Sequence, residues 1–468
     1  MHIGSEDVTS SQTMDVLLPY EGSVVARVHA GDRHSLARAV KAAREGASAM
    51  AALANYERAD LLERIAKLLR RDLEHIAHWI CLETGKPIKE ARLEANRGLD
   101  TLRAASIAAR ELRGEVVAMD AAVSGKGRMA MTVREPVGVI GAITPFNFPF
   151  NLTLHKLAPA LAAGNAVIHK PADRTPVSAL LLARLVHEAG APRGAYNVIP
   201  GDGPGLGQAL VADPGVDMIT FTGSVPVGKA IRAAAGLKKV TLELGNNSAM
   251  ILEADGDMET AVARSVVGSF THSGQVCISL QRIFVHESVA QEFLQRLVAA
   301  TEMLVCGHPL EERTDISSLI AEKEAVRVEE WIEEAAAVGA RVLTGGRRRY
   351  ATVPPAVLSD VPPEVKLSCR EVFGPVVAVS TYRSLDSAID AVNGTPYGLQ
   401  AGIFTTNIDR AFAAARRLRV GGVMINDIPS YRVDHMPYGG VKESGLGREG
   451  PRYAIEEMSE MKLICWRA

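Results

Sequence analysis

The chain has 468 residues, 47% of them hydrophobic and 23% charged, which is enough for two or three domains of ordinary size. Its formal net charge of −2, with interspersed charges, gives no bulk attraction to nucleic acid or to an anionic membrane, and no apolar run approaches the ~20 residues of a membrane span. Five cysteines without a C-x-x-C pair, and a polar segment 1–12 unlike a signal peptide, predict a cytoplasmic protein with free thiols.

Helices open the chain and a hairpin follows them. Between residues 35 and 113, apolar residues recur at spacings of three and four, which is the period of amphipathic helices. Two alternating segments come next, 115–119 and 129–134, with the small polar residues 124–127 between them. Such alternation is typical of strands with one solvent-exposed face, so we expect a β-hairpin here.

Short apolar strands then alternate with helices. Their continuous hydrophobicity marks strands covered on both faces, so the pattern predicts a doubly wound α/β sheet of parallel strands. A second α/β block of the same style spans residues 255–449, and a last strand candidate, 461–465, has no partner nearby in the sequence. The strands expected in the first block are 137–143, 166–169, 196–199, 218–221 and 240–244, and those in the second lie near 282–285, 376–380 and 422–425.

A cysteine and a glutamate indicate the chemistry. Cys277 follows Gly274-Gln275-Val276 in a polar loop, and Glu243 ends an apolar strand. A thiol that attacks a carbonyl and a carboxylate that activates water are the two groups that thioester chemistry needs. The other four cysteines are expected to be small hydrophobic residues of the core. The pair therefore predicts an enzyme.

The turn after the first parallel strand has the sequence Thr144-Pro145-Phe146-Asn147-Phe148-Pro149. An Asn at the carboxyl end of a strand can donate its amide N–H to a developing oxyanion. Alternatively, Asn147 only completes the hydrogen bonds of its own turn. The sequence leaves both interpretations open.

Two later turns suit a nucleotide. Lys170 and Asp173 follow the second strand, where a doubly wound sheet binds nucleotides and where an acid can bind a ribose diol; the alternative is a surface charge at a strand end. Gly223 and Ser224 open a helix after the fourth strand and suit a pyrophosphate. Neither turn has the G-x-G-x-x-G fingerprint, and the nearest match, at 201–205, indicates only a turn.

Seven motifs occur in the order and approximate spacing of the aldehyde dehydrogenase superfamily, which the chain resembles from about residue 19 to residue 465. Within the superfamily it looks most like the branch of lactaldehyde and non-phosphorylating glyceraldehyde-3-phosphate dehydrogenases. The motifs are P-F-N-F-P at 145–149, K-P at 170–171, F-T-G-S at 221–224, E-L-G at 243–245, G-Q-V-C at 274–277, E-V-F-G-P at 371–375 and P-Y-G-G at 437–440.

The resemblance implies a role for each matching residue. Cys277 would attack the aldehyde, Asn147 and the Cys277 N–H would hold the oxyanion, and Glu243 would activate the water that hydrolyses the thioester. NAD is the implied cofactor, with NADP as an alternative, and no metal is implied. Lys170 and Asp173 would hold the adenosine ribose, Ser224 the pyrophosphate and Glu371 the nicotinamide ribose. The full set implied at the cofactor is Thr144, Pro145, Phe146, Lys170, Asp173, Gly223, Ser224, Leu244, Glu371 and Phe373.

The substrate pocket differs from that of relatives with hydrophobic aldehydes. Asn151 and His155 are polar there, which favours a short, polar or hydroxylated aldehyde. Val276 stands where members that bind phosphonate, phosphate or carboxylate often carry Arg, which weakens the case for an anionic semialdehyde. Arg97 keeps that alternative open, because it matches a second anion-binding Arg of such enzymes or is an ordinary helix-surface residue. The rest of the expected wall is Phe148, Leu152, Ile278, Tyr431 and Tyr438.

The resemblance also implies a three-part architecture: a Rossmann-like nucleotide domain (1–114 and 137–244), an α/β catalytic domain (245–449) and a small β oligomerisation flap (115–136 and 450–468). Because the hairpin and the last strand lack local partners, we expect them to pair across subunits of a homodimer or homotetramer. A catalytically silent homologue is disfavoured because Asn147, Glu243, Cys277 and Glu371 are all intact. The presence of Glu243 favours hydrolysis of the thioester over transfer of the acyl group to coenzyme A, because members that use coenzyme A typically lack this glutamate. One departure is Gly245-Asn246-Asn247, where the family has Gly-Gly-Lys.

Overall fold

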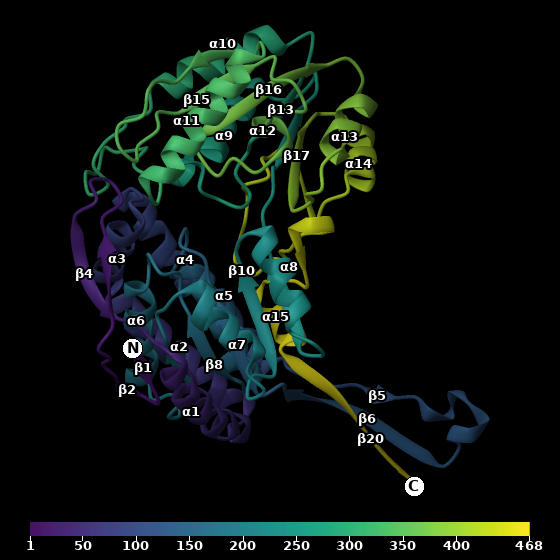
Figure 1. Ribbon diagram of the computed structural model, residues 1–468. Helices are drawn as coiled ribbons and strands as arrows, with labels where there is room; N and C mark the ends of the chain where they lie inside the picture. Colours follow the sequence, from purple (N-terminus) through teal and green to yellow (C-terminus); the bar gives the residue numbers. More distant parts are fainter. Residues whose placement is uncertain (468) are drawn as a thin grey trace.

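Four helices form the front of the chain, as predicted. The computed structural model describes residues 1–467 and has two lobes and a projecting β arm (Figure 1). Apolar residues of α2, such as Leu62 and Ile65, are fully buried against α4 and α5, which explains the helical period of the sequence. The helices are α1 (Arg33–Ala52), α2 (Asn55–Arg71), α3 (Leu73–Thr84) and α4 (Ile88–Arg110).

The lower lobe contains the predicted doubly wound sheet. Its central strands are parallel in the order β11-β10-β7-β8-β9, and short antiparallel strands extend both edges. The strands are β1 (His2–Ile3), β2 (Glu6–Asp7), β7 (Val139–Ile143), β8 (Ala166–Lys170), β9 (Tyr196–Val198), β10 (Met218–Thr222), β11 (Lys239–Glu243) and β19 (Gly445–Leu446). The helices between them are α5 (Asn151–Ala163), α6 (Val177–Glu188), α7 (Gln208–Ala212) and α8 (Val225–Ala234).

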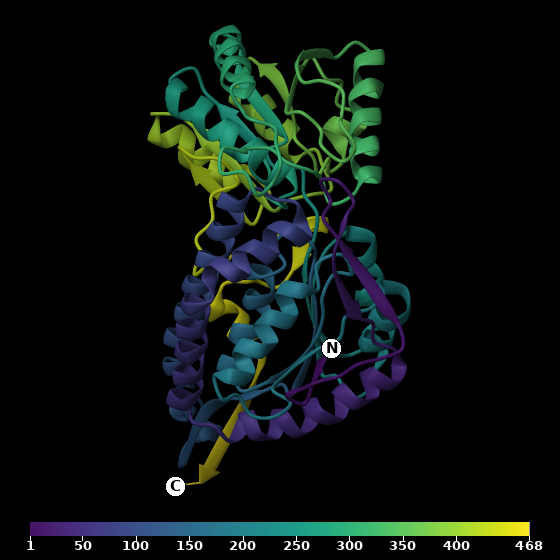
Figure 2. The same cartoon turned by 90° about the vertical axis from the view of Figure 1, so that its left-hand side faces the viewer.

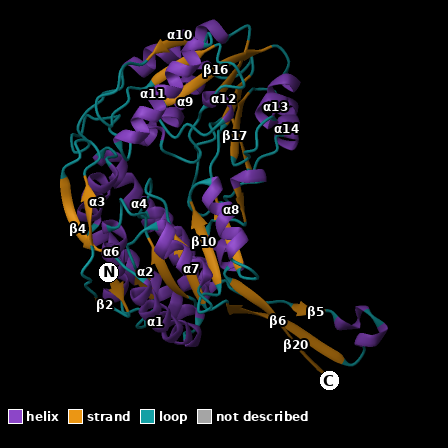
Figure 3. Ribbon diagram, viewed as in Figure 1, coloured by secondary structure: helices purple, strands orange, loops and turns teal. Residues whose placement is uncertain are grey.

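The upper lobe is a second α/β sheet with helices beside its strands (Figure 3). Its order is β14-β15-β16-β13-β12-β17-β18, with only β14 antiparallel. The strands are β12 (Ala249–Leu252), β13 (Arg282–His286), β14 (Arg341–Thr344), β15 (Ala356–Ser359), β16 (Val376–Tyr382), β17 (Gln400–Phe404) and β18 (Gly422–Ile425). The helices are α9 (Met258–Phe270), α10 (Ala290–Glu302), α11 (Glu322–Ala337), α12 (Lys366–Cys369), α13 (Leu385–Asn393) and α14 (Ile408–Arg417).

The arm corrects one prediction. It consists of β5 (Val116–Val117), β6 (Arg128–Pro136) and β20 (Ser459–Arg467). The last strand has no partner nearby in the sequence, but the expectation that it stays unpaired within one chain is wrong, because β20 pairs with β6 over its full length. Helix α15 (Pro451–Glu457) packs on α4 and α5 and brings the end of the chain back to the hairpin. A contact over more than 300 residues leaves no local sequence signal.

The N-terminal segment is more ordered than its polar sequence indicates. Met1 and Ile3 are buried, and β1 pairs with β9 at the edge of the lower sheet. Strands β3 (Thr13–Leu17) and β4 (Val24–His29) form a separate ribbon (Figure 2). Strand β1 has two residues, too few for a periodic pattern, and the alternation in the five and six residues of β3 and β4 was not used in the prediction. Among residues 1–467, no helix is long and apolar enough to cross a membrane.

The two lobes meet at the end of β11. Residues 244–248 alone separate β11 of the lower sheet from β12 of the upper sheet. Glu243, the last residue of β11, therefore lies at the junction of the lobes. The division into domains at the boundaries given above stays a prediction.

Candidate active site

Cys277 lies in a tight loop after α9. The loop contains the short 3-10 turn Thr271–Gly274, in which His272, Ser273 and Gly274 have positive φ. A Cβ on Gly274 would collide with the carbonyl of Gly374, so glycine is required there. Cys277 is half-buried, and its Sγ lies 2.8 Å from the hydroxyl of Tyr438. Burial raises the pKa of the Cys277 thiol to about 11.

Asn147 is held against this cysteine loop. Its Nδ2 donates to the carbonyl oxygen of Gln275 at 2.8 Å, two residues before Cys277. Its Oδ1 is buried and has no hydrogen-bond partner among residues 1–467. The bond leaves one amide proton of Asn147 uncommitted. The alternative, in which the Asn147 side chain only completes hydrogen bonds of its own turn, is therefore wrong, because the side chain bonds to the loop of Cys277 instead.

A buried ion pair supports the turn that carries Asn147. Lys86 and Glu94 are fully buried and 2.5 Å apart. Glu94 also accepts from the backbone N–H groups of Phe150 and Asn151 at the start of α5, and the Lys86 ammonium lies 3.8 Å from the centroid of the Phe148 ring. These contacts fix both ends of the Phe148–Asn151 corner, directly after Asn147.

Glu243 is buried beside a second carboxylate. Its Oε2 has no partner among the described residues, and burial, reinforced by Glu449, raises the pKa of Glu243 well above its usual range. An added Cβ on Gly439 would lie 2.9 Å from the Glu243 carboxylate. Gly439, from the P-Y-G-G motif, therefore leaves room for Glu243 at the lobe junction.

Sequence reasoning missed the cluster behind Glu243. Lys156 donates to Glu449 at 3.0 Å, and Arg432 donates to the other oxygen of Glu449 at 3.1 Å. Burial opposes the charge on Glu449, but Lys156 and Arg432 outweigh it and lower the pKa of Glu449 to about 2. The sequence did carry a signal, because Lys156 is the one Asp, Glu, Lys or Arg residue in the segment 151–163. The structure buries all 13 residues of this helix, α5, and a buried lysine needs a partner.

Asp434 connects three predicted pocket residues. It pairs with Arg97 through two hydrogen bonds of 2.8 and 3.1 Å and accepts from Asn151 at 3.0 Å and from the His155 ring at 2.8 Å. Burial would raise the pKa of Asp434, but His155 and Arg97 lower it well below its usual range. Burial also lowers the pKa of His155. Arg97 is thus not an ordinary surface residue, since its side chain is only 26% exposed and bound.

The remaining predicted pocket residues are buried or half-buried, with the exception of Tyr431. Val276, Ile278 and Tyr438 pack together around Cys277. Leu152 is buried in α5. Tyr431 is 42% exposed, and the interactions found for it involve its backbone, which binds Ile428 and Gln400.

The cofactor residues lie at the carboxyl ends of β7, β8, β10 and β11. Lys170 is buried, with its ammonium 2.9 Å from the carboxylate of the exposed Asp173, and Thr144 hydrogen-bonds His169 at 2.7 Å. Gly223 and Ser224 precede α8, and Ser224 makes no side-chain cap. Thr222 Oγ1 is buried there without a partner among residues 1–467. An uncapped helix start beside an orphaned hydroxyl suits a phosphate.

Glu371 and Phe373 approach the same edge from the upper lobe. Glu371 accepts from the N–H of Asn246 at 2.9 Å, and burial raises its pKa to about 7. An added Cβ on Gly245 would collide with the Glu371 carboxylate. Phe373 has a φ of 49°, and its ring meets Phe146 edge to face at 5.8 Å. Pro145 lies in the same turn as Phe146, and the N–H of Leu244 donates to Ser444.

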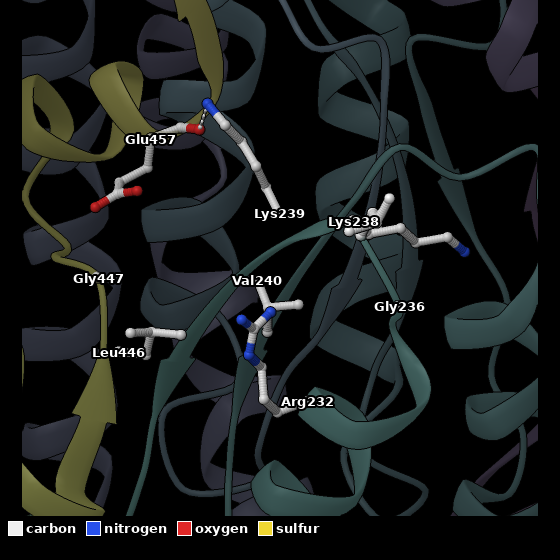
Figure 4. Close-up of a pocket in the computed structure, with 9 residues that line it drawn as sticks. Arg232, Gly236, Lys238, Lys239, Val240, Leu446, Gly447 and Glu457 are labelled. Atoms are coloured by element: carbon white, nitrogen blue, oxygen red, sulfur yellow. Dashed lines mark hydrogen bonds between the residues drawn. The ribbon is translucent and has the colours of Figure 1, made fainter.

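A hollow at the opposite end of β11 is not part of this site. Its volume is about 380 Å³, and Arg232, Lys238 and Lys239 line it with Leu446 and Glu457 (Figure 4). Lys239 begins β11, whereas Glu243 ends it. Both lysines already donate to backbone carbonyls, Lys238 at 2.6 and 2.7 Å and Lys239 at 2.9 and 3.3 Å. The site at the lobe junction is therefore the candidate active site.

Comparison with known proteins gives consistent results. Residues 7–464 match the model of the aldehyde dehydrogenase family. A 3-sulfolactaldehyde dehydrogenase of Priestia aryabhattai is 47% identical over 99% of this chain and 97% of its own, and a lactaldehyde dehydrogenase of Methanococcus maripaludis is 39% identical over 97% of each. The crystal structure of glyceraldehyde-3-phosphate dehydrogenase GapN from Methanocaldococcus jannaschii, complexed with NADP, superposes with a TM-score of 0.94 at 40% identity, over 97% of this chain and 99% of that one.

Proposed function

This chain belongs to the aldehyde dehydrogenase family and is an NAD(P)-dependent enzyme, and from this premise we propose that it oxidises a short, polar aldehyde with an anionic group to the carboxylic acid. The observation that carries the proposal is that Asn147 is bonded to the loop of Cys277, with Glu243 close enough to influence the thiol, beside three cationic side chains that share two ionised carboxylates. The predicted placement in the branch of lactaldehyde and glyceraldehyde-3-phosphate dehydrogenases is confirmed.

Addition to the aldehyde begins at Cys277. The thiolate forms a C–S bond with the carbonyl carbon, and the C=O π electrons move to the oxygen. The uncommitted N–H of Asn147 and the N–H of Cys277 stabilise this oxyanion. The bond from Asn147 to Gln275 holds the amide beside the cysteine loop before substrate arrives, so no reorganisation is needed at the moment of reaction.

The residues at the strand ends fit a dinucleotide. Lys170 and Asp173 would hold the adenosine ribose, the start of α8 at Ser224 the pyrophosphate, and Glu371 the nicotinamide ribose. A nicotinamide bound there would supply the acceptor for the hydride that leaves the carbon attached to Cys277. Phe146 and Phe373 pack edge to face at the same edge and would orient the ring and exclude water.

Hydrolysis of the thioester requires a base. Glu243 takes a proton from water, the resulting hydroxide attacks the thioester carbon, and the C–S bond breaks to release the acid and the thiolate. Its raised pKa makes Glu243 a stronger base than an exposed glutamate once its proton has left. Glu449, held by Lys156 and Arg432, stays ionised nearby and favours retention of the proton on Glu243.

The charges around the pocket support an anionic substrate. Arg97, Arg432 and Lys156 share only two ionised carboxylates, those of Asp434 and Glu449. His155 adds no charge at neutral pH because its pKa is lowered. Lys156 and Arg432 are buried and Arg97 is 26% exposed, so the excess positive charge is largely shielded from water and is costly unless an anion neutralises it. A sulfonate, phosphate or carboxylate on the substrate would do so.

A neutral hydroxyaldehyde is the second candidate. Val276 supplies no cation next to Cys277, and the arginines are already paired. The test is a panel of 3-sulfolactaldehyde, glyceraldehyde-3-phosphate, lactaldehyde and hexanal, each with NAD and with NADP, followed by absorbance of the reduced nicotinamide. The proposal expects the highest kcat/KM among the anionic aldehydes. A higher value for lactaldehyde would favour the second candidate, and one for hexanal would contradict both.

We also propose a homodimer or homotetramer in the cytoplasm. The outer edge of β20 is an open strand edge, and its exposed residues include Met461, Leu463, Ile464 and Trp466. A long apolar edge strand is a surface that proteins cover. A second copy of the arm would cover it by strand pairing. All five cysteines are free thiols, which supports a reducing compartment.

A further inference from the structure

Tyr438 contacts the sulfur of Cys277 directly. Its hydroxyl oxygen lies 2.8 Å from Sγ, within hydrogen-bonding distance. The Tyr438 side chain is buried, with 2% of the residue exposed. Neither the loop chemistry of Cys277 nor the mechanism above uses this hydroxyl.

The direction of the hydrogen bond follows from the ionisation of the two groups. Burial raises the pKa of Tyr438 well above its usual range, so the phenol keeps its proton. A thiolate has no proton to donate. In the reactive form of Cys277, therefore, Tyr438 donates and the sulfur accepts.

Arg432 and Glu449 fix the Tyr438 ring. The Arg432 guanidinium carbon lies 3.7 Å from the ring centroid, in the geometry of a cation–π contact. Tyr438 and Glu449 exchange two backbone hydrogen bonds of 2.7 and 3.1 Å, and Glu449 also accepts from Arg432. The hydroxyl is thus aimed at Cys277 by a closed set of contacts.

The surroundings of Cys277 otherwise oppose its ionisation. Burial has the largest effect, and the carboxyl groups of Glu243 and Glu371 add to it. The hydrogen bond from Tyr438 is the largest opposing influence, followed by the charge of Arg432. Since only the thiolate is nucleophilic, the site depends on these two groups.

We propose that Tyr438 is a further catalytic residue, which donates a hydrogen bond to the Cys277 thiolate and keeps the nucleophile reactive before the aldehyde arrives. Arg432 is its positioning residue, through the contact with the ring. The inference rests on the proposed role of Cys277 as nucleophile. When the C–S bond forms, the sulfur loses its negative charge and becomes a weaker acceptor for the Tyr438 hydroxyl.

The test measures the ionisation of Cys277 without aldehyde or cofactor. Wild type and Tyr438→Phe are alkylated with iodoacetamide at several pH values between 7 and 10, below the pKa of the Cys277 thiol, and the modified peptide that contains Cys277 is quantified by mass spectrometry. Loss of a charge-assisted hydrogen bond should lower the rate constant for Cys277 by about ten- to hundredfold at each pH. The peptide readout is needed because Cys306 and Cys465 are exposed. The matched control is Tyr56→Phe on α2, a tyrosine 61% exposed to solvent, which should leave the rate constant unchanged.

A second variant guards against failure of Tyr438→Phe to fold. Arg432→Met removes the cation and the ring contact and should also lower the rate constant for Cys277. An unchanged rate constant in either folded variant would overturn the inference while the proposed function stands. Failure of iodoacetamide to modify Cys277 in wild type at any pH would instead contradict its proposed role as nucleophile.

Discussion

The buried pair of Lys86 and Glu94 allows a quantitative prediction for Glu94→Gln. The substitution keeps the size of the side chain but removes the charge, and its amide presents N–H donors where Lys86 needs an acceptor. Both groups are 0% exposed, so the ammonium would stay buried without a counter-charge. Breaking such a pair costs about 3–5 kcal/mol of unfolding free energy. For cooperative unfolding of a 468-residue chain the shift is roughly 1 °C per kcal/mol, so the expected fall in Tm is roughly 3–5 °C.

The assay is thermal unfolding by circular dichroism at one fixed protein concentration, because assembly shifts the apparent Tm. The matched control is Glu74→Gln, which breaks an exposed ion pair with Arg92 and should leave Tm close to wild type. The double variant Lys86→Met with Glu94→Gln should recover part of the loss, since it buries no charge. A Tm for Glu94→Gln within about 1 °C of wild type would show that the pair does not support the fold; that margin corresponds to about 1 kcal/mol.

Four further outcomes are expected. Cys277→Ala should abolish aldehyde oxidation and leave cofactor binding intact by calorimetry; near-normal turnover would contradict its role. Glu243→Gln should give one burst of reduced cofactor and then stall as the thioester accumulates, whereas unchanged steady-state turnover would mean that another group activates water. The Asp173 carboxylate should repel a 2′-phosphate and favour NAD, although Lys170 reduces the effect; a higher kcat/KM with NADP would refute this. Leu463→Glu, on the open edge of β20, should lower the oligomer size in light scattering, and an unchanged mass would exclude that edge as the interface.

Local patterns in the sequence were enough to predict the layered α/β fold. Buried parallel strands carry continuous apolar runs, and amphipathic helices carry a 3.6-residue period. The positions of Glu243 at a strand end and of Cys277 in a polar loop were equally local. The role of Asn147 was open on its residues alone and came from the resemblance to the aldehyde dehydrogenase superfamily; in the structure, Asn147 is bonded to the loop of Cys277.

The pairing of charges, in contrast, depends on contacts between segments far apart in the chain. Arg97 and Asp434 are 337 residues apart and Lys156 and Glu449 are 293 apart, so no spacing in the chain predicts their pairing. The same holds for β20 and β6, whose partnership depends on the return of the chain through α15. It also holds for Tyr438, which the sequence predicted only as part of the substrate-pocket wall and which in the structure contacts the Cys277 sulfur. Burial and long-range contact set the ionisation of these groups, and both arise only when distant segments pack together.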